Sequence, residues 1–376
     1  MKILVSAGEA SGDRYAAELV EELRRRIPEA EFFGCGGQHL RAAGLRAVVR
    51  SEDLAVVGIF EVVRHLPRIY GLFRRLVNAA LAKRPALAIL TDSPDFHLRL
   101  AARLHAAGIP VLYYVAPQVW AWRPGRIRLI RKFVDHLMCI FPFEETYFRE
   151  RGVAATFVGH PLAHQLSPTC SRSEFFGRHG LDPGLETIAI LPGSRKGEAA
   201  RHLAPLADAI SRLQNTRPMN FVLPASSTTG TMFFRERIDN PVVKIIEGGA
   251  QDALGHADLA LLASGTATVE AAILGTPMVV FYRVSTATWA AGKMLVDVPF
   301  YSMVNLLAER KIVPELIQAE CRGERLAGEA LRLLDDSAER ERMKAGLACV
   351  RDRLSASGLA AERAASIVCD IASAAS

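Results

Sequence analysis

Short apolar runs alternate with amphipathic helical patterns along most of this chain. This alternation is typical of parallel sheets with helices on both faces, because each parallel strand reaches its neighbour through a helical crossover. In the first half, the pattern predicts strands near residues 2–6, 31–33, 87–91, 110–115, 136–141 and 155–158. Helices are predicted between them, near residues 13–26, 60–82, 97–107 and 144–151.

A second series of the same kind begins after a short stretch around Leu166–Thr169 that loses apolar periodicity. Because 376 residues exceed the usual size of one hydrophobic core, two domains are expected. The second series predicts strands near residues 187–191, 219–223, 242–246, 258–262 and 278–282, and residues 325–372 read as wholly helical. The predicted class is therefore α/β, with two Rossmann-like domains facing a cleft.

Composition limits the class of protein further. Half of the residues are hydrophobic and 23% are charged, which excludes a disordered or fibrous chain. The six cysteines include no CxxC pair, so neither a zinc cluster nor a disulfide framework is expected. No export signal and no membrane-spanning segment is predicted, and the scattered thiols indicate a cytosolic protein.

The first predicted strand is followed by a loop that contains Gly8, Glu9, Ser11 and Gly12. In open parallel sheets, ligands bind at the carboxyl ends of the strands. The two glycines allow close backbone approach, and the next helix offers free N–H groups to an anion. The alternative is a strand–helix turn that needs glycine only for its geometry.

Two carboxylates follow the predicted strand that ends at Thr91. Asp92 lies at the tip of the strand, where it can act as a general base on a hydroxyl nucleophile. Asp95 lies where the next helix begins, and capping that helix is the simpler role for it.

The loop after residues 187–191 contains Gly193, Ser194 and Arg195 just before a helix. Small residues, a guanidinium and a helix start together suit a diphosphate, because each favours negative charge. A solvated turn is the alternative.

A similar loop after residues 258–262 contains Ser264, Gly265 and Thr266. Glu270 follows Thr266 by four residues, on the same helical face, where a carboxylate can accept both hydroxyls of a ribose. A capping role is the alternative, but two anion-binding loops in one domain favour a nucleotide.

These segments together resemble one enzyme family, the lipid-A-disaccharide synthases. The resemblance extends in order from Leu4 to about Gln318, and the run Trp120-Ala121-Trp122-Arg123 is its most specific part. The matching segments are Gly8–Asp13, Asp92–Phe96, Tyr114–Arg123, Phe141–Glu144, Phe157–Pro161, Leu191–Arg195, Ser264–Glu270 and Asn305–Leu307. The sequence departs from the usual family pattern at Ala116, Gln118 and His97, and His97 is interpreted as a polar helix residue.

The resemblance implies the GT-B glycosyltransferase architecture and an inverting transfer. A diacylated glucosamine would move from UDP to the 6-hydroxyl of a diacylglucosamine 1-phosphate, giving the β-1,6 disaccharide of lipid A, with neither metal nor cofactor. The C-terminal domain would bind UDP through Arg195, the Ser264–Thr266 loop, Glu270 and Asn305. Asp92 would be the base, with Glu9 as the second candidate, and Gly8, Ser11, Gly12 and Asp95 would contact the acceptor. Expected domains are residues 1–168 and 169–345, with the helical tail 346–376 packing back on the first.

Both substrates carry acyl chains, so contact with an anionic membrane on the cytosolic face is expected. Residues 56–77 place Arg64, Arg68 and Arg75 on one helical face and Ile69 and Phe73 on another. Such a helix can lie in a membrane interface, although a core-facing helix with a solvated basic rim has the same pattern. The net charge of +6 is modest for this length, and no nucleic-acid motif accompanies it.

Two other functions remain open from the sequence. A UDP-sugar 2-epimerase would also need two phosphate-binding loops, and a membrane-associated module could bind UDP without turnover. A homodimer is a further expectation from the resemblance.

Overall fold

The computed structural model describes residues 1–54, 59–121, 124–286, 289, 298–356 and 358–374, with only the backbone for 59–66, 124 and 374. The chain forms two compact units. Unit 1 comprises Met1–Pro161 and Leu354–Ser376, and unit 2 comprises Leu162–Arg353. From the sequence, the changes of domain were predicted after residues 168 and 345.

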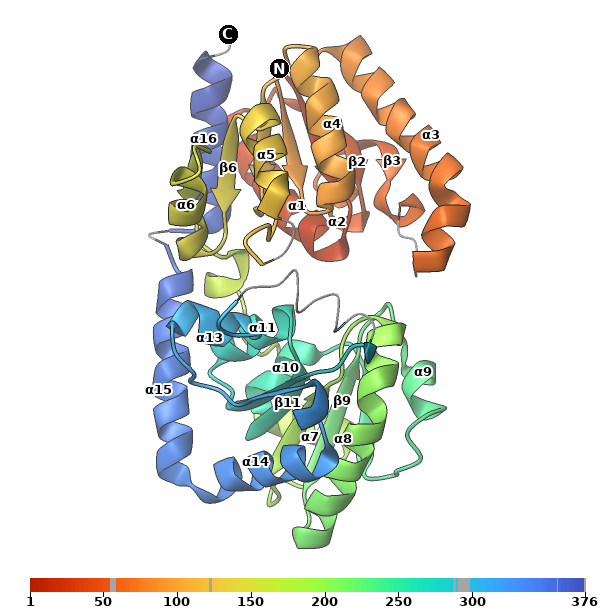
Figure 1. Cartoon of the computed structure of the whole chain (residues 1–376), viewed down its shortest axis with the longest axis vertical. Coiled ribbons are helices and arrows are strands. Elements are labelled where there is room, and N and C mark those ends of the chain that lie inside the picture. Colours follow the sequence, from red (N-terminus) through yellow and green to blue (C-terminus); the bar gives the residue numbers. More distant parts are fainter. Residues whose placement is uncertain (55–58, 122–123, 287–288, 290–297, 357, 375–376) are drawn as a thin grey trace. The chain divides into compact units, whose positions relative to one another are not determined.

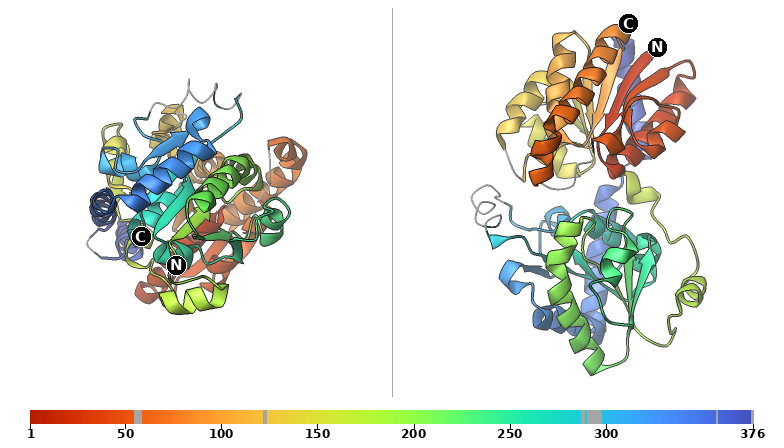
Figure 2. Two further views of the ribbon diagram at one scale, coloured as in Figure 1. Left: turned by 90° about the horizontal axis from the view of Figure 1, so that it is seen from below. Right: turned by 90° about the vertical axis from the view of Figure 1, so that its right-hand side faces the viewer.

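Unit 1 is built on a seven-stranded, fully parallel sheet of order β3-β2-β1-β4-β5-β6-β7. Its central strands are apolar on both faces because helices cover both faces, as Figures 1 and 2 show. The strands are β1 (Lys2–Ala7), β2 (Glu31–Gly36), β3 (Arg46–Arg50), β4 (Leu87–Thr91), β5 (Val111–Tyr114), β6 (His136–Cys139) and β7 (Ala155–Phe157).

The helices of unit 1 include one from the C-terminal end of the chain. They are α1 (Ala10–Arg26), α2 (Gln38–Ala42), α3 (Ile59–Lys83), α4 (Pro94–Ala106), α5 (Ile127–Phe133), α6 (Pro142–Arg149) and α16 (Ala360–Ala374). Helix α16, blue in Figure 1, packs on α1, and Arg26 Nη1 donates to Ser366 Oγ at 2.7 Å. Arg363 Nη2 donates to the Phe157 carbonyl at 2.9 Å, which ties α16 to the end of β7.

Unit 2 repeats the plan with a six-stranded parallel sheet of order β10-β9-β8-β11-β12-β13. The strands are β8 (Thr187–Leu191), β9 (Asn220–Ala225), β10 (Val243–Glu247), β11 (Leu259–Ala263), β12 (Met278–Tyr282) and β13 (Glu315–Ile317). The helices are α7 (Arg172–His179), α8 (Lys196–Thr216), α9 (Thr231–Arg235), α10 (Ala250–His256), α11 (Thr266–Leu274), α13 (Met303–Ala308), α14 (Gly323–Asp335) and α15 (Ser337–Leu354). Short 3₁₀ turns are η1 (Ser51–Asp53), η2 (Pro124–Arg126), η3 (Pro161–His164) and η4 (Gln318–Glu320).

The structure confirms the predicted α/β class and every strand named from the sequence, with ends that differ by at most a few residues. Two strands at sheet edges, β3 and β13, were missed because neither is a continuous buried apolar run, and β13 has only three residues. Residues 325–372, predicted to be wholly helical, form parts of three helices, with breaks at Asp336 and before Ala360. In the described part of the chain, no helix has both the length and the apolar character needed to span a bilayer.

Candidate active site

In each sheet the strand order reverses beside the first strand, between β1 and β4 in unit 1 and between β8 and β11 in unit 2. At such a reversal, the loops at the carboxyl ends diverge and leave room for a ligand. The four loops selected from the sequence are the loops that follow these four strands. The topology therefore brings Gly8–Gly12 to Asp92 in unit 1, and Gly193–Arg195 to the Ser264–Thr266 loop in unit 2.

In unit 1, the loop after β1 encloses the Asp92 carboxylate. The backbone N–H of Gly8 donates to Oδ1 at 3.0 Å, and that of Glu9 donates to Oδ2 at 3.1 Å. A Cβ atom on Gly12 would overlap Oδ2, and one on Gly8 would overlap the Ser93 hydroxyl. Glycine is therefore required at both positions for the carboxylate to sit against the backbone.

The backbone at Asp92 is held in an unusual conformation. Asp92 and Ser93 have φ angles of 58° and 40°, and Val115, after the neighbouring β5, has a φ of 64°. Non-glycine residues seldom adopt this left-handed region, and a β-branched residue does so at still higher energy. Such strain persists where the surrounding structure imposes it, typically at functional sites.

Two side chains hold that conformation by donating to the Asp92 carbonyl. One is the Tyr113 hydroxyl, and the other is Nδ1 of His97 at 2.8 Å. The second ring nitrogen of His97, Nε2, lies 2.8 Å from the Ser6 hydroxyl. His97 is fully buried, so it is more than the polar helix residue interpreted from the sequence.

Burial raises the pKa of the Asp92 carboxyl to about 7, and the nearby Glu9 carboxylate adds to the rise. Hydrogen bonds from Ser93, Gly8 and Glu9 oppose this shift, because they favour the charged form. A carboxyl with a pKa near neutrality is suited to remove a proton from an alcohol at neutral pH.

The other predicted acceptor-side residues lie at the rim of this loop. Glu9 is the exposed residue immediately before α1, and Ser11 is exposed in its first turn. Asp95 does not cap α4, because Ser93 occupies the capping position. Asp95 instead forms an ion pair with Arg126, which no sequence pattern predicted.

Trp120, the first residue of the Trp-Ala-Trp run, is anchored at the same edge of the sheet. Trp120 Nε1 donates to a buried Glu144 oxygen at 3.0 Å, and the Trp120 ring packs edge-on against Phe143. Burial raises the pKa of Glu144 to about 8. Trp122 and Arg123 lie outside the described residues.

In unit 2, Gly193, Ser194 and Arg195 lead from β8 into α8. Gly193 has a φ of 115°, and a Cβ atom there would overlap the Glu198 side chain. Arg195 is the residue immediately before α8, and it and Ser194 are exposed. Burial raises the pKa of Glu198, while Arg195 nearby acts in the opposite direction.

His202, which was not predicted from the sequence, holds the start of this loop at Pro192. Its Nδ1 lies 2.7 Å from the Pro192 carbonyl, and its Nε2 accepts from the Arg283 N–H at 2.9 Å. The buried ring therefore joins the end of β8 to the end of β12. A single histidine at a helical position carries no sequence signal for such a role.

The second loop of unit 2 leads from β11 into α11. Gly265 and Thr266 are exposed at the start of the helix, whereas the Ser264 hydroxyl donates to the Tyr301 carbonyl at 2.6 Å. Thr266 and Glu270 both lie in the first turns of α11, as the spacing predicted. The Ser264 hydroxyl is thus engaged within the protein, whereas the residues at the helix start, Gly265 and Thr266, are exposed.

Asn305 is buried, and its amide is engaged within the protein. Nδ2 donates to the Val313 carbonyl at 3.0 Å and to Glu315 Oε1 at 2.8 Å. Oδ1 accepts from the N–H groups of Ile312 and Val313 at 2.8 and 3.0 Å. All four hydrogen-bonding positions of this amide are used, so its side chain supports the segment before β13 rather than reaching a ligand.

Helix α3 carries the residues predicted to touch a membrane. Leu72, Leu76 and Ala80 lie in the hydrophobic core, and Phe73 packs against it, edge-on to Phe96. Arg68 pairs with Asp53 at 2.6 Å, and Arg75 donates to the Val48 carbonyl at 3.0 Å. Ile69 is half-buried, Tyr70 is 61% exposed, and the Arg64 side chain lies outside the described residues.

Among the described residues, one group has atoms spaced for a metal ion: Cys170, Asp252 and His256. Both carboxylate oxygens of Asp252 already accept from Thr169, its N–H at 2.5 Å and its hydroxyl at 2.6 Å. His256 Nε2 bonds the Cys170 carbonyl at 2.8 Å. These contacts explain the group as an anchor for the segment that enters unit 2.

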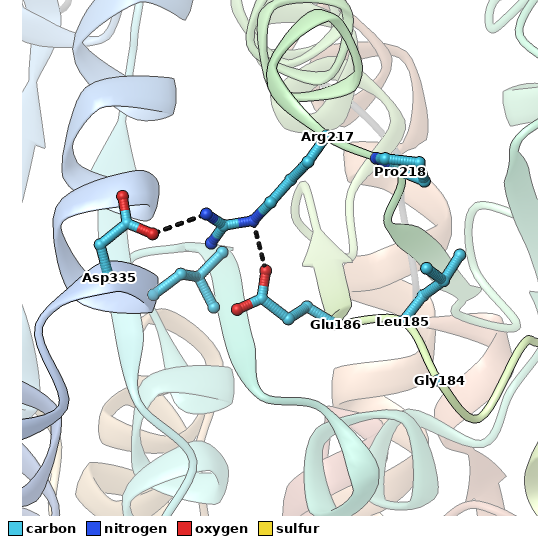
Figure 3. Close-up of a pocket in the computed structure, with 7 residues that line it drawn as sticks. Gly184, Leu185, Glu186, Arg217, Pro218 and Asp335 are labelled. Carbon is cyan, nitrogen blue, oxygen red and sulfur yellow. Dashed lines mark hydrogen bonds and ion pairs between the residues drawn. The ribbon is translucent and has the colours of Figure 1, made fainter.

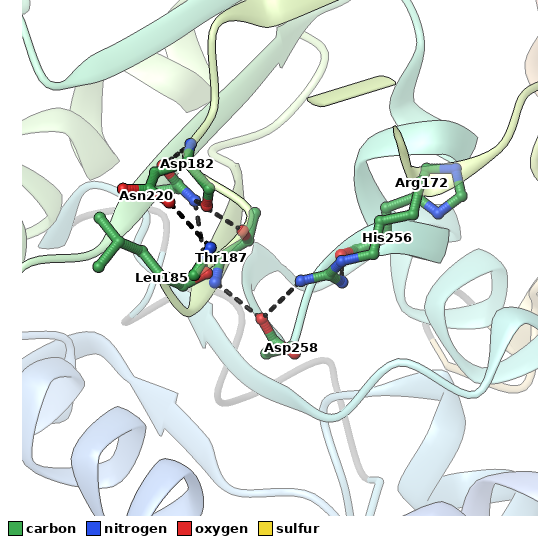
Figure 4. A network of polar contacts seen from close by, with 8 residues as sticks. Arg172, Asp182, Leu185, Thr187, Asn220, His256 and Asp258 are labelled. Atoms are coloured by element: carbon green, nitrogen blue, oxygen red, sulfur yellow. Dashed lines mark hydrogen bonds and ion pairs between the residues drawn. The ribbon is translucent and has the colours of Figure 1, made fainter. Parts of the chain in front are cut away.

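At the amino-terminal ends of the unit 2 strands, charged side chains pair with one another. An open depression of about 540 Å³ there is lined by Glu186, Arg217 and Asp335, and Arg217 bridges the two carboxylates (Figure 3). Nearby, Asp258 accepts from the Thr187 N–H at 2.8 Å and from Arg172 at 3.4 Å (Figure 4). None of the predicted site residues lies in either cluster.

The chain was compared with solved structures. It is similar to UDP-GlcNAc 2-epimerase from Neisseria meningitidis bound to UDP-GlcNAc, with a TM-score of 0.64 at 13% identity over 98% of this chain and 99% of that one. It is equally similar to the calicheamicin glycosyltransferase CalG4, with a TM-score of 0.63 at 18% identity over 98% of each chain. These likenesses confirm the predicted GT-B class and, at such identities, show the fold alone.

Comparison with family models and curated proteins is more specific. The model of the lipid-A-disaccharide synthetase family matches residues 3–368. Lipid-A-disaccharide synthases from Solibacter usitatus and Koribacter versatilis are 59% and 45% identical, covering 98% and 99% of this chain and 97% and 99% of their own lengths. The resemblance inferred from the sequence is thereby confirmed, and the chain belongs to the lipid-A-disaccharide synthase family.

Proposed function

We propose that this protein transfers a diacylated glucosamine from UDP to the 6-hydroxyl of a diacylglucosamine 1-phosphate, with inversion, to form the β-1,6-linked disaccharide of lipid A and UDP. Family membership supports the reaction. The observation that carries the mechanism is the Asp92 carboxyl, held against the backbone at the point where the strand order reverses, with a pKa of about 7.

On the acceptor side, Asp92 removes the proton from the attacking hydroxyl. Its buried carboxylate gains more by taking up a proton than an exposed carboxylate would. Glu9 lies beside it and raises its proton affinity, so we assign Glu9 to orienting the sugar. Gly8, Gly12 and Ser11 shape the acceptor subsite, and Asp95 contributes through its ion pair with Arg126.

On the donor side, UDP gains negative charge as the bond to the anomeric carbon breaks. Arg195 and the helix start at Gly265–Thr266 are exposed donors that can receive this charge. One preorganised donor of this kind contributes about 3–4 kcal/mol to lowering a barrier. We propose that Gly193, Ser194 and Ser264 shape the two loops that bind the nucleotide. Glu270 would bind the ribose, and Asn305 would hold the segment before β13 in place. No metal or other cofactor enters this proposal.

Because the substrates carry acyl chains, we propose that the protein acts at the cytosolic face of the inner membrane as a peripheral protein. Tyr70, Arg68 and Arg75 are exposed on α3, which supports this helix as the contact with anionic lipid. Salt-sensitive co-sedimentation with anionic vesicles tests the contact, and light scattering tests the proposed homodimer.

The test of the reaction is UDP release and disaccharide formation from the diacylated donor and acceptor. Asp92→Ala lowers kcat at least about a hundredfold, the usual loss for a general base, with folding unchanged by circular dichroism. A folded and active Asp92→Ala enzyme would remove Asp92 from this role. Incubation with UDP-GlcNAc alone separates the 2-epimerase alternative, and UDP binding without turnover would indicate a binding module.

A further inference from the structure

The His97 ring lies in a buried hydrogen-bonded chain that ends on the backbone of Asp92. A carbonyl can only accept, so the Nδ1 atom that contacts the Asp92 carbonyl must carry the proton. In a neutral ring Nε2 then accepts, and the Ser6 hydroxyl donates to it. Burial lowers the pKa of His97 to about 4, which keeps the ring neutral.

The Asp92 carbonyl and the Asp92 carboxylate are positioned by different contacts. The carbonyl accepts hydrogen bonds from His97 and Tyr113, while the carboxylate accepts hydrogen bonds from the N–H groups of Gly8 and Glu9. Both sets form while Asp92 has a left-handed φ of 58°. Without donors on the carbonyl, the residue can relax toward the common backbone regions and carry its carboxylate away from the β1 loop.

We propose that His97 is a positioning residue for Asp92: its Nδ1–H holds the carbonyl, and so keeps the carboxylate in the buried place where it acts as a base. This inference rests on the proposed function. Titratable groups facing Asp92 are Glu9 before α1, Cys35 from β2, Tyr113 from β5 and His97 itself from α4. Arg126, a cation that acts on Tyr113, is paired with Asp95. Burial is the largest cause of the raised pKa of Asp92, so displacing the carboxylate into water lowers its proton affinity.

Substitution of His97 by Asn or by Gln distinguishes the roles of its two ring nitrogens. Asn places an N–H donor at the position of Nδ1, where it can still reach the Asp92 carbonyl but not Ser6. Gln places its donor at the position of Nε2, near Ser6 and away from the carbonyl. A role through Asp92 therefore predicts that Asn works and Gln fails, whereas a role in filling the core makes no such distinction.

The experiment measures kcat, both KM values and the pH profile of kcat/KM for the acceptor in His97→Asn, His97→Gln and Asp92→Asn. The kcat of His97→Asn is expected to stay within about threefold of wild type. Its acid limb, the fall in rate at low pH, should lie at the same pH as in wild type. His97→Gln is expected to lose about thirtyfold or more in kcat, since a displacement of about 1 Å can cost a hundredfold. Its acid limb should move to lower pH by at least about one unit, while the donor KM stays within about twofold.

Two controls complete the test. His136 lies at the start of β6, at the amino-terminal end of the strand and away from Asp92, and it forms a hydrogen bond with Thr156. His136→Asn should change neither kcat nor the acid limb. Tyr113→Phe removes the other donor to the same carbonyl and should move the limb in the same direction, so it carries the test if the Gln variant does not fold.

The outcomes are distinguishable. If Asp92→Asn is inactive while His97→Gln keeps both kcat and the acid limb of wild type, the inference about His97 is wrong. If Asp92→Asn is itself active, the proposed function of Asp92 is wrong, whatever the His97 variants do.

Discussion

At the scale of single residues, different contacts set the proton affinity of Asp92 and the position of its carboxyl group. Burial raises the proton affinity of the carboxyl, while hydrogen bonds from the backbone of the β1 loop keep the charged form possible. The sequence predicted Asp92, because a carboxylate at a strand tip is visible in the chain. His97, Tyr113 and His202 were not predicted as support, because their partners lie on other elements. Asn305 was predicted at the donor site, but a sequence motif cannot show that its amide is already saturated.

The raised pKa of Asp92 predicts the pH dependence of the reaction. The active form of a base is the deprotonated one, so the rate rises with pH through the pKa of about 7 and then levels. Below pH 6, the rate should fall about tenfold per pH unit, measured as kcat/KM for the acceptor. A limb near pH 4, the ordinary range of an Asp carboxyl, would contradict the account.

At the scale of secondary-structure elements, the β1–α1 turn is the part of the site that the sequence described best. Its glycines predicted close backbone approach, and the structure shows what approaches: the Asp92 carboxylate at Gly12 and the Ser93 hydroxyl at Gly8. The inner strands were predictable because each is an apolar run. Strand β3 has the burial of an edge strand and begins and ends with arginine, so its pattern did not stand out.

Gly12→Ala tests that turn. The new Cβ atom would overlap Oδ2 of Asp92, so the carboxylate must move, and kcat should fall by about tenfold to a hundredfold. UDP affinity, which we assign to unit 2, should stay unchanged. The matched control is Gly71→Ala in α3, where a Cβ meets nothing within 4 Å and alanine favours the helix. Equal activity of the two variants would show that close approach at Gly12 is unimportant.

At the scale of the whole molecule, the chain divides its two proposed tasks between two units, and the second unit is inserted into the first. The C-terminal helix α16 completes unit 1 by packing on α1 and bonding to the end of β7. Periodicity predicted two domains, because each sheet has its own series of strands. Where the chain passes from one unit to the other depends on long-range contacts that local patterns do not record.

Val368→Asp tests the contribution of α16. Val368 is fully buried, and an unpaired charge there should lower the stability of unit 1 by about 3 kcal/mol or more. Calorimetry should show one transition at lower temperature, with loss of activity but retained UDP binding by unit 2. Ser373→Asp, at an exposed position of the same helix, should leave both transitions in place. Loss of UDP affinity in a folded unit 2 would contradict this division of tasks.

The most direct test of the central claim is a calorimetric titration of UDP into wild type, Arg195→Ala and Asp92→Asn. The account predicts that wild type and Asp92→Asn bind UDP with Kd values within about twofold of each other. Arg195→Ala should bind about tenfold to a hundredfold more weakly, the loss expected for one charged hydrogen bond. Arg212 lies in α8, the helix that Arg195 precedes, but far from the start of that helix, and it pairs with Asp208, so Arg212→Ala should bind UDP like wild type. Undiminished UDP affinity in Arg195→Ala, or its loss in a folded Asp92→Asn, would contradict the assignment of nucleotide to unit 2 and base to unit 1.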